Sequence, residues 1–234
     1  IKKVVLSLRK DGIKKTAIKV KNKLKKNGII SSQQNDSILH TVKEEEKTIE
    51  DFINQDLRDI QPISTVIVNE GIKRLNFVTD SIEAHSLLGG VATALVIASE
   101  FANKYNLPLR IITRTTPVNP LDYENILTLM GIKIPNDISF YTDYDRDAGG
   151  NSTYKLEISD QDIFFATSWW SAKAIEKTTL RKRFFYIIQE VETFFYPHGD
   201  RHYLCSQVMK NPNIDFIVNS HYLFEYFAEN EPNI

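Results

Sequence analysis

Short apolar runs alternate with amphipathic segments after Pro62. The runs are rich in β-branched and aromatic residues and are apolar at successive positions, which is typical of strands buried on both faces of a parallel sheet. They lie at 75–79, 109–113, 138–142, 162–167, 183–189 and 215–220. Helices are predicted between most of them, at 91–105, 123–130, 170–177, 200–209 and 222–228. This alternation predicts an α/β domain with a Rossmann-like parallel sheet and helices on both faces.

The first 62 residues follow a different pattern and are predicted to form a helical segment. The stretch 2–26 is strongly basic and has apolar residues at steps of three and four, namely Ile13, Ala17, Val20 and Leu24. The stretch 44–59 is acidic and has a similar apolar stripe. The opposite charges favour an antiparallel helix pair, while the basic stretch is also a candidate for contact with anionic lipid. We therefore divide the chain into a helical segment at 1–62 and a Rossmann-like domain at 63–234.

Composition narrows the class of protein. The formal net charge is −1, so the basic excess of a nucleic-acid-binding domain is absent and no nucleic-acid partner is expected. Cys205 is the single cysteine, which excludes an internal disulfide and fits a reducing compartment. No apolar run is long enough to predict a membrane-spanning helix. We expect a cytoplasmic protein, and the basic stretch makes it a candidate for peripheral contact at the inner membrane face.

The first loop of the predicted sheet is a candidate anion site. Ligands of such sheets bind beyond the carboxyl ends of the strands, near the topological switch point. Gly89 and Gly90 stand there at a helix start, where free N–H groups and the helix dipole favour an anion such as a diphosphate. His85 precedes them and is placed to bond a sugar or phosphate. Neither a G-x-G-x-x-G pattern nor a P-loop lysine is present, so we expect no NAD or ATP cofactor. A tight packing turn explains the glycine pair equally well.

The segment after the fifth predicted strand combines polar groups with aromatic rings. Gln189, Glu190 and Glu192 follow the strand, and Tyr196 and Gly199 flank a predicted turn. Carboxylates and amides bond sugar hydroxyls, while aromatic faces cover the apolar face of a sugar ring. These five residues are therefore predicted to hold a donor or acceptor sugar. The competing interpretation is a packed aromatic loop with solvated acids.

These two segments, GGVATAL and YIIQEVETFFYPHGDRHYL, together resemble the rhamnosyltransferase and rhamnan-synthesis family of retaining GT-B glycosyltransferases. The matching residues of the second segment are Ile188, Gln189, Glu192, Phe195, Tyr196, Pro197 and Gly199. The chain departs from the family segment at Glu190, Val191, Thr193 and Asp200. The resemblance spans about residues 74–230. It implies a two-domain enzyme in which this chain is the N-terminal, acceptor-side half and the glycine loop approaches the donor diphosphate.

The resemblance also implies an activity. The intact protein would be a hexosyltransferase that moves a sugar, with rhamnose expected, from a nucleotide-sugar such as dTDP-rhamnose to a surface polysaccharide. The acceptor would be a glycan or a lipid-linked glycan. Retaining GT-B enzymes often carry E-x7-E in the second half, and this chain has no glutamate pair at that spacing. We therefore expect the 234-residue piece to be inactive by itself.

Two alternatives stay open at this point. The domain could be a non-catalytic module that binds a glycan or nucleotide. It could also be a GT-A type transferase, because Asp143 and Asp145 follow a predicted strand as a D-x-D pair that positions a metal, although a solvated acidic loop is the commoner outcome. His198, His202 and Cys205 lack a fourth ligand, so no metal site is predicted there.

Overall fold

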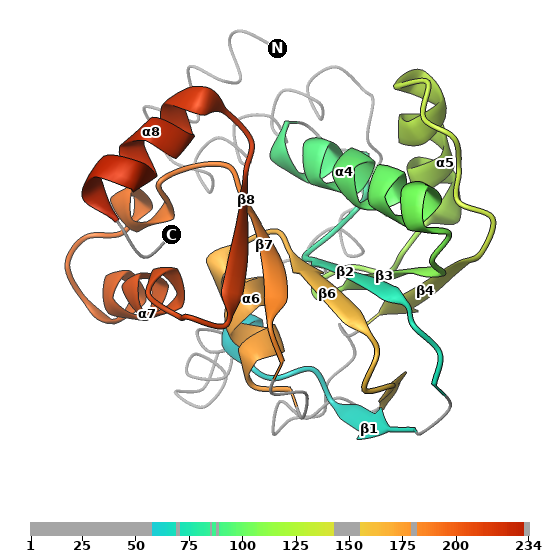
Figure 1. Cartoon of the computed structure of the whole chain (residues 1–234), viewed down its shortest axis with the longest axis horizontal. Helices are drawn as coiled ribbons and strands as arrows, with labels where there is room; N and C mark the ends of the chain where they lie inside the picture. The colour runs from blue at the N-terminus through green and yellow to red at the C-terminus, as the bar shows by residue number, and fades with distance from the viewer. Residues whose placement is uncertain are drawn as a thin grey trace, which may run out of the picture. The chain divides into compact units, whose positions relative to one another are not determined.

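Figure 1 shows the computed structural model of the chain. The structure describes residues 58–68, 71–84, 86–87, 89–142, 155–178 and 182–231. All of them belong to a unit that comprises residues Asp51–Ile234. The helices predicted within the first 57 residues lie outside the described residues, and so do His85, Asp143 and Asp145.

The main sheet has six strands, and all neighbouring strands pair in parallel. The strands are β2 (Leu75–Thr79), β3 (Leu109–Thr113), β4 (Ile138–Thr142), β6 (Ile163–Ala166), β7 (Phe184–Ile188) and β8 (Ile214–Val218). Their spatial order is β4-β3-β2-β6-β7-β8. Counted along the chain this order is 3-2-1-4-5-6, the strand order of the Rossmann fold. The predicted Rossmann-like parallel sheet is confirmed.

Helices cover both faces of this sheet, as predicted (Figure 1). Helices α4 (Gly90–Tyr105) and α5 (Pro120–Leu129) pack on one face, where the core includes Phe77 and Ile187. Helices α6 (Trp169–Glu176), α7 (Asp200–Met209) and α8 (His221–Asn230) contribute to the core on the other face, which includes Val78 and Ile188. The side chains of successive strand residues thus enter opposite cores, because their Cβ atoms point to opposite faces.

The sequence patterns place most element bounds closely. The strands predicted at 75–79, 109–113 and 138–142 have those bounds in the structure. Helix α5 begins three residues before its predicted start, because Pro120 occupies its first turn and the Asn119 side chain accepts a hydrogen bond from the Leu121 N–H. The 3-10 helix η2 (Arg58–Ile60) lies within the stretch predicted to be helical. Three short elements were missed: η3 (Glu192–Phe195) and the strands β1 (Thr65–Ile67) and β5 (Leu156–Ile158), which form a separate two-stranded parallel sheet.

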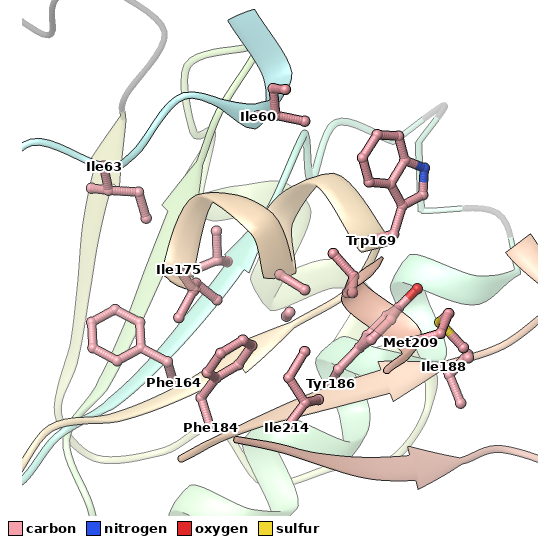
Figure 2. Close-up of a cluster of buried hydrophobic side chains, with 14 of the residues drawn as sticks. Ile60, Ile63, Phe164, Trp169, Ile175, Phe184, Tyr186, Ile188, Met209 and Ile214 are labelled. Atoms are coloured by element: carbon pink, nitrogen blue, oxygen red, sulfur yellow. The ribbon is translucent and has the colours of Figure 1, made fainter. Parts of the chain in front are cut away.

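The stretch before β2 is packed onto the domain. Ile60 and Ile63 are buried in the core around α6, and Figure 2 shows them with Trp169 and Tyr186 in this cluster. Asp59 forms an ion pair with Arg201 of α7. These contacts hold residues 59–63 beside the helices that follow β6 and β7.

Candidate functional site

The sheet order fixes where a ligand site is expected. Strands β2 and β6 are neighbours at the centre of the sheet, and the chain leaves them toward helices on opposite faces, α4 and α6. Their carboxyl ends therefore define the topological switch point, the usual ligand position in open α/β sheets. We use the term switch-point site for the residues that follow β2, β6 and β7, together with the first turns of α4 and α6.

The start of α4 is free for an anion. Gly89 has a φ of +80°, a conformation that favours glycine, and its surface is exposed. No side chain caps α4, and its first turn has no acidic residue. Among the α-helices of the described residues, only α4 has neither a side-chain cap nor an acidic residue in its first turn. Helices α5, α6 and α8 are capped, and α7 has Asp200 in its first turn. The first N–H groups of α4 thus remain available to a phosphate.

Gly90 and Gln189 bring the two predicted motifs together. A Cβ atom built on Gly90 would lie 1.9 Å from Oε1 of Gln189. The Gln189 side chain therefore rests directly on the first residue of α4, although 99 positions separate the two residues in the sequence. An amide can both donate and accept hydrogen bonds, so Gln189 adds an adaptable polar group to the helix start.

Glu192 lies under the first turn of α6. Its side chain is buried, and Oε2 accepts a hydrogen bond of 2.8 Å from the backbone N–H of Trp169. Burial raises the pKa of Glu192 to about 7, and the charge of Asp80 adds to this rise. Interactions with the Tyr186 hydroxyl and the Trp169 N–H oppose the rise in pKa. Glu192 thus supports the start of α6 from inside the domain.

Tyr196 contacts the same tryptophan. Its hydroxyl accepts a hydrogen bond of 3.0 Å from Nε1 of Trp169, and the two rings meet edge to face with centroids 5.7 Å apart. Trp169 itself is fully buried. Burial raises the pKa of Tyr196. The structure therefore brings Glu192 and Tyr196 together on Trp169, a residue of the core.

Asp80 and Trp170 form a pair that the sequence patterns did not single out. Nε1 of Trp170 donates to both carboxylate oxygens of Asp80, at 2.9 and 2.8 Å. Burial raises the pKa of Asp80, whereas the Trp170 hydrogen bond and the positive charge of Arg114 oppose this. The pair joins the end of β2 to the first turn of α6. In the sequence, the one indication that Asp80 belongs to the site was its position directly after the first predicted strand. Its partner Trp170 is 90 residues away, so the pair itself could not be predicted.

The remaining predicted residues have simpler surroundings. Glu190 is exposed next to Gln189. Gly199 is exposed before the first residue of α7, and its φ of 168° is an extended conformation that any residue adopts, so the backbone does not require glycine there. Within the described ranges, no three His, Cys, Asp or Glu side chains gather in a group that could hold a metal ion.

The fold and the switch-point site define a Rossmann-like α/β domain with an open helix start at the end of its first main-sheet strand. The chain belongs to the family described as "WsaF, N-terminal domain", whose model matches residues 74–220. This family is associated with glycosyltransferases. The matched range contains all six strands of the main sheet and all the described residues of the switch-point site.

No curated protein matches the chain. In the part of the chain that the structure describes, every helix is too short or too polar to cross a bilayer.

Proposed function

We propose that this chain is the acceptor-side half of a two-domain GT-B glycosyltransferase. The intact enzyme would transfer a sugar, rhamnose, from a nucleotide-sugar such as dTDP-rhamnose to a glycan or lipid-linked glycan of a surface polysaccharide. Membership of a glycosyltransferase-associated family supports the reaction class. The observation that carries the proposal is the uncapped start of α4 at the switch point, with Gln189 resting on Gly90.

This arrangement suits a nucleotide diphosphate. Negative charge develops on the diphosphate as the bond to the transferred sugar breaks, and fixed N–H dipoles that face this charge stabilise the transition state. The first turn of α4 supplies such dipoles, and the helix dipole acts in the same direction. Gly89 has no side chain that would keep a phosphate away from the backbone. Gln189 would donate its amide N–H to a phosphate oxygen or to a sugar hydroxyl.

Glu192 and Tyr196 would act through Trp169. Both were predicted to touch a sugar, but their observed partner is the start of α6. We therefore assign them a positioning role: they hold the first turn of α6, where Trp170 binds Asp80 at the end of β2. Direct ligand contacts would then fall to Gly89, Gly90 and Gln189. Contacts by His85, Glu190 and Gly199, a cytoplasmic location and binding to the membrane face stay predictions.

The test compares sugar transfer by the full-length protein and by this chain over a panel of nucleotide-sugars that includes dTDP-rhamnose. We expect transfer by the full-length protein only. Gln189→Ala should raise KM for the donor by about tenfold, the effect of losing one hydrogen bond to a charged group. Gln207→Ala is the matched control, because Gln207 is exposed on α7. If the full-length protein binds nucleotide-sugars but transfers no sugar, the proposed enzyme is refuted and the non-catalytic binding module is the better interpretation.

A further inference from the structure

Two phenylalanines after β7 are turned toward solvent. Phe194 and Phe195 lie in η3, and their exposed fractions are 72% and 65%. Phenylalanine is usually buried, since its ring gains free energy when it leaves water. Two adjacent exposed rings in an ordered element are therefore a candidate binding surface.

The element that carries these rings is firmly attached to the domain. Glu192, its first residue, is buried and accepts the hydrogen bond from the Trp169 N–H. Tyr196, which follows the element, binds the Trp169 indole. The ring of Phe194 also meets Tyr226 of α8 edge to face, with centroids 5.7 Å apart. These contacts fix the backbone of η3 and the ring of Phe194, which lowers the entropy that a ligand must remove on binding.

These rings lie close to the donor side of the switch-point site. Phe194 is five positions after Gln189 in the sequence, and five extended residues span at most about 18 Å. This distance corresponds to a few linked sugar rings, so one oligosaccharide could reach from η3 to the end of β7.

The charges in this loop favour a neutral ligand. The exposed charged residues beside η3 in sequence are Glu190 and Asp200, and both are acidic. The next lysine or arginine in the sequence, Arg201, is paired with Asp59. An acidic rim repels an anionic membrane surface, whereas carboxylates readily accept hydrogen bonds from sugar hydroxyls.

We propose that Phe194 and Phe195, with Tyr226 behind Phe194, form an aromatic platform that binds the pyranose rings of a neutral acceptor glycan. The platform rests on the proposed function, because it names the acceptor surface of the same site. Each ring offers a flat apolar face to the C–H face of a sugar, and the acidic residues of the loop bind the hydroxyls at its rim.

The test uses a rhamnan trisaccharide as the probe. In full-length protein, the double substitution Phe194→Ala/Phe195→Ala should raise KM for the trisaccharide by about tenfold or more, as expected when aromatic anchors are truncated. KM for the nucleotide-sugar should not change. The variant Phe194→Tyr/Phe195→Tyr should restore trisaccharide binding. The matched control is Tyr105→Ala, because Tyr105 is 56% exposed at the end of α4.

Binding measured without transfer separates the two proposals. Saturation-transfer NMR on this chain should show the trisaccharide bound to wild type and not to the double alanine variant. If wild type binds the trisaccharide in this way but full-length protein transfers no sugar, the proposed function fails and the platform stands. If wild type does not bind the trisaccharide, or the double variant binds it equally well, the platform is refuted. The platform is also refuted if the double alanine variant loses only its binding to phosphatidylglycerol vesicles, which would identify a membrane as the occupant. It is likewise refuted if the variant loses only a dimer seen in sedimentation, which would identify a second copy of the chain.

Discussion

The carboxylate of Glu192 accepts a 2.8 Å hydrogen bond from the backbone N–H of Trp169, 23 residues earlier in the chain. This bond links η3 to the first turn of α6, and so connects the exits of β7 and β6. It also places a carboxyl group in a buried position, where its charged form is costly. The stability of the domain should therefore depend on the protonation of this group.

Glu192→Gln should change the pH dependence of unfolding. The folded-state pKa of about 7 lies above the ordinary value of 4.5, so the folded protein holds the proton more tightly than the unfolded chain. The contribution of Glu192 to stability is therefore fully present below pH 4.5 and is lost as the pH rises through 7. Relative to wild type, the glutamine variant should gain about 3 kcal/mol of unfolding free energy between pH 4.5 and pH 8.

Urea unfolding of both proteins at several pH values measures this difference. Parallel stability curves for wild type and variant would show that Glu192 keeps an ordinary pKa. Because glutamine retains an oxygen that accepts the Trp169 N–H, we expect the variant to fold, and any loss of sugar transfer would then reflect the position of α6.

Removal of the Asp80 carboxylate should destabilise the domain through Trp170. In Asp80→Ala the indole N–H loses its partner in a half-buried site, which costs about 1–3 kcal/mol. Asp80→Asn keeps an accepting oxygen and should cost less. Thermal unfolding should give melting temperatures that fall in the order wild type, Asp80→Asn, Asp80→Ala. Asp137→Ala serves as the control, since Asp137 is exposed; equal melting temperatures for the two Asp80 variants would contradict the prediction.

Gly90 and Gln189 should be coupled in donor binding. A methyl group at Gly90 would overlap the Gln189 amide, which must then move. Gly90→Ala should therefore raise KM for the nucleotide-sugar in wild type, and should raise it much less in the Gln189→Ala background. A double-mutant cycle on full-length protein measures this coupling. If the effects of Gly90→Ala and Gln189→Ala on the free energy of donor binding are additive, Gly90→Ala acts without displacing Gln189.

Tyr196→Phe should loosen the packing around Trp169. The substitution removes the hydroxyl that accepts the indole N–H and keeps the ring contact. We expect a loss of about 1 kcal/mol in unfolding free energy, with a shift in tryptophan emission. Tyr203→Phe is the control, because Tyr203 is exposed on α7. An unchanged emission spectrum together with unchanged stability would argue against the indole contact.

The sequence predicted the main sheet well because each of its strands is a run of four or five residues that is mostly apolar. Leu75–Thr79 and Leu109–Thr113 are entirely buried, and such runs have few other interpretations. Strands β1 and β5 have only three residues each, too few for a periodic pattern. They form through pairing with each other across the chain, which local sequence does not reveal.

The candidate site was predicted in part. Gly90 and Gln189 were both identified, each from its position after a strand, but their direct contact was not predicted, because β6 lies between β2 and β7 in the sheet. The directions of side chains within η3 could not be predicted, since the sequence ETFF shows two aromatics and one acid without showing which of them faces the core. The Asp80–Trp170 pair was missed for a related reason, because its members have no pattern in common.

The packing of residues 59–63 determines where the chain can be truncated without loss of core contacts. The family match begins at Arg74, but Ile60 and Ile63 fill part of the core beside α6. A protein that starts at Arg74 would lack these side chains, the Asp59 partner of Arg201, and the Gln61 carbonyl that accepts from Arg114. Such a truncation would remove two apolar side chains from the core cluster that includes Ile175, and one hydrogen-bond acceptor from each of two arginines. We therefore expect a piece that starts at Arg74 to be less stable than one that includes residues 59–63.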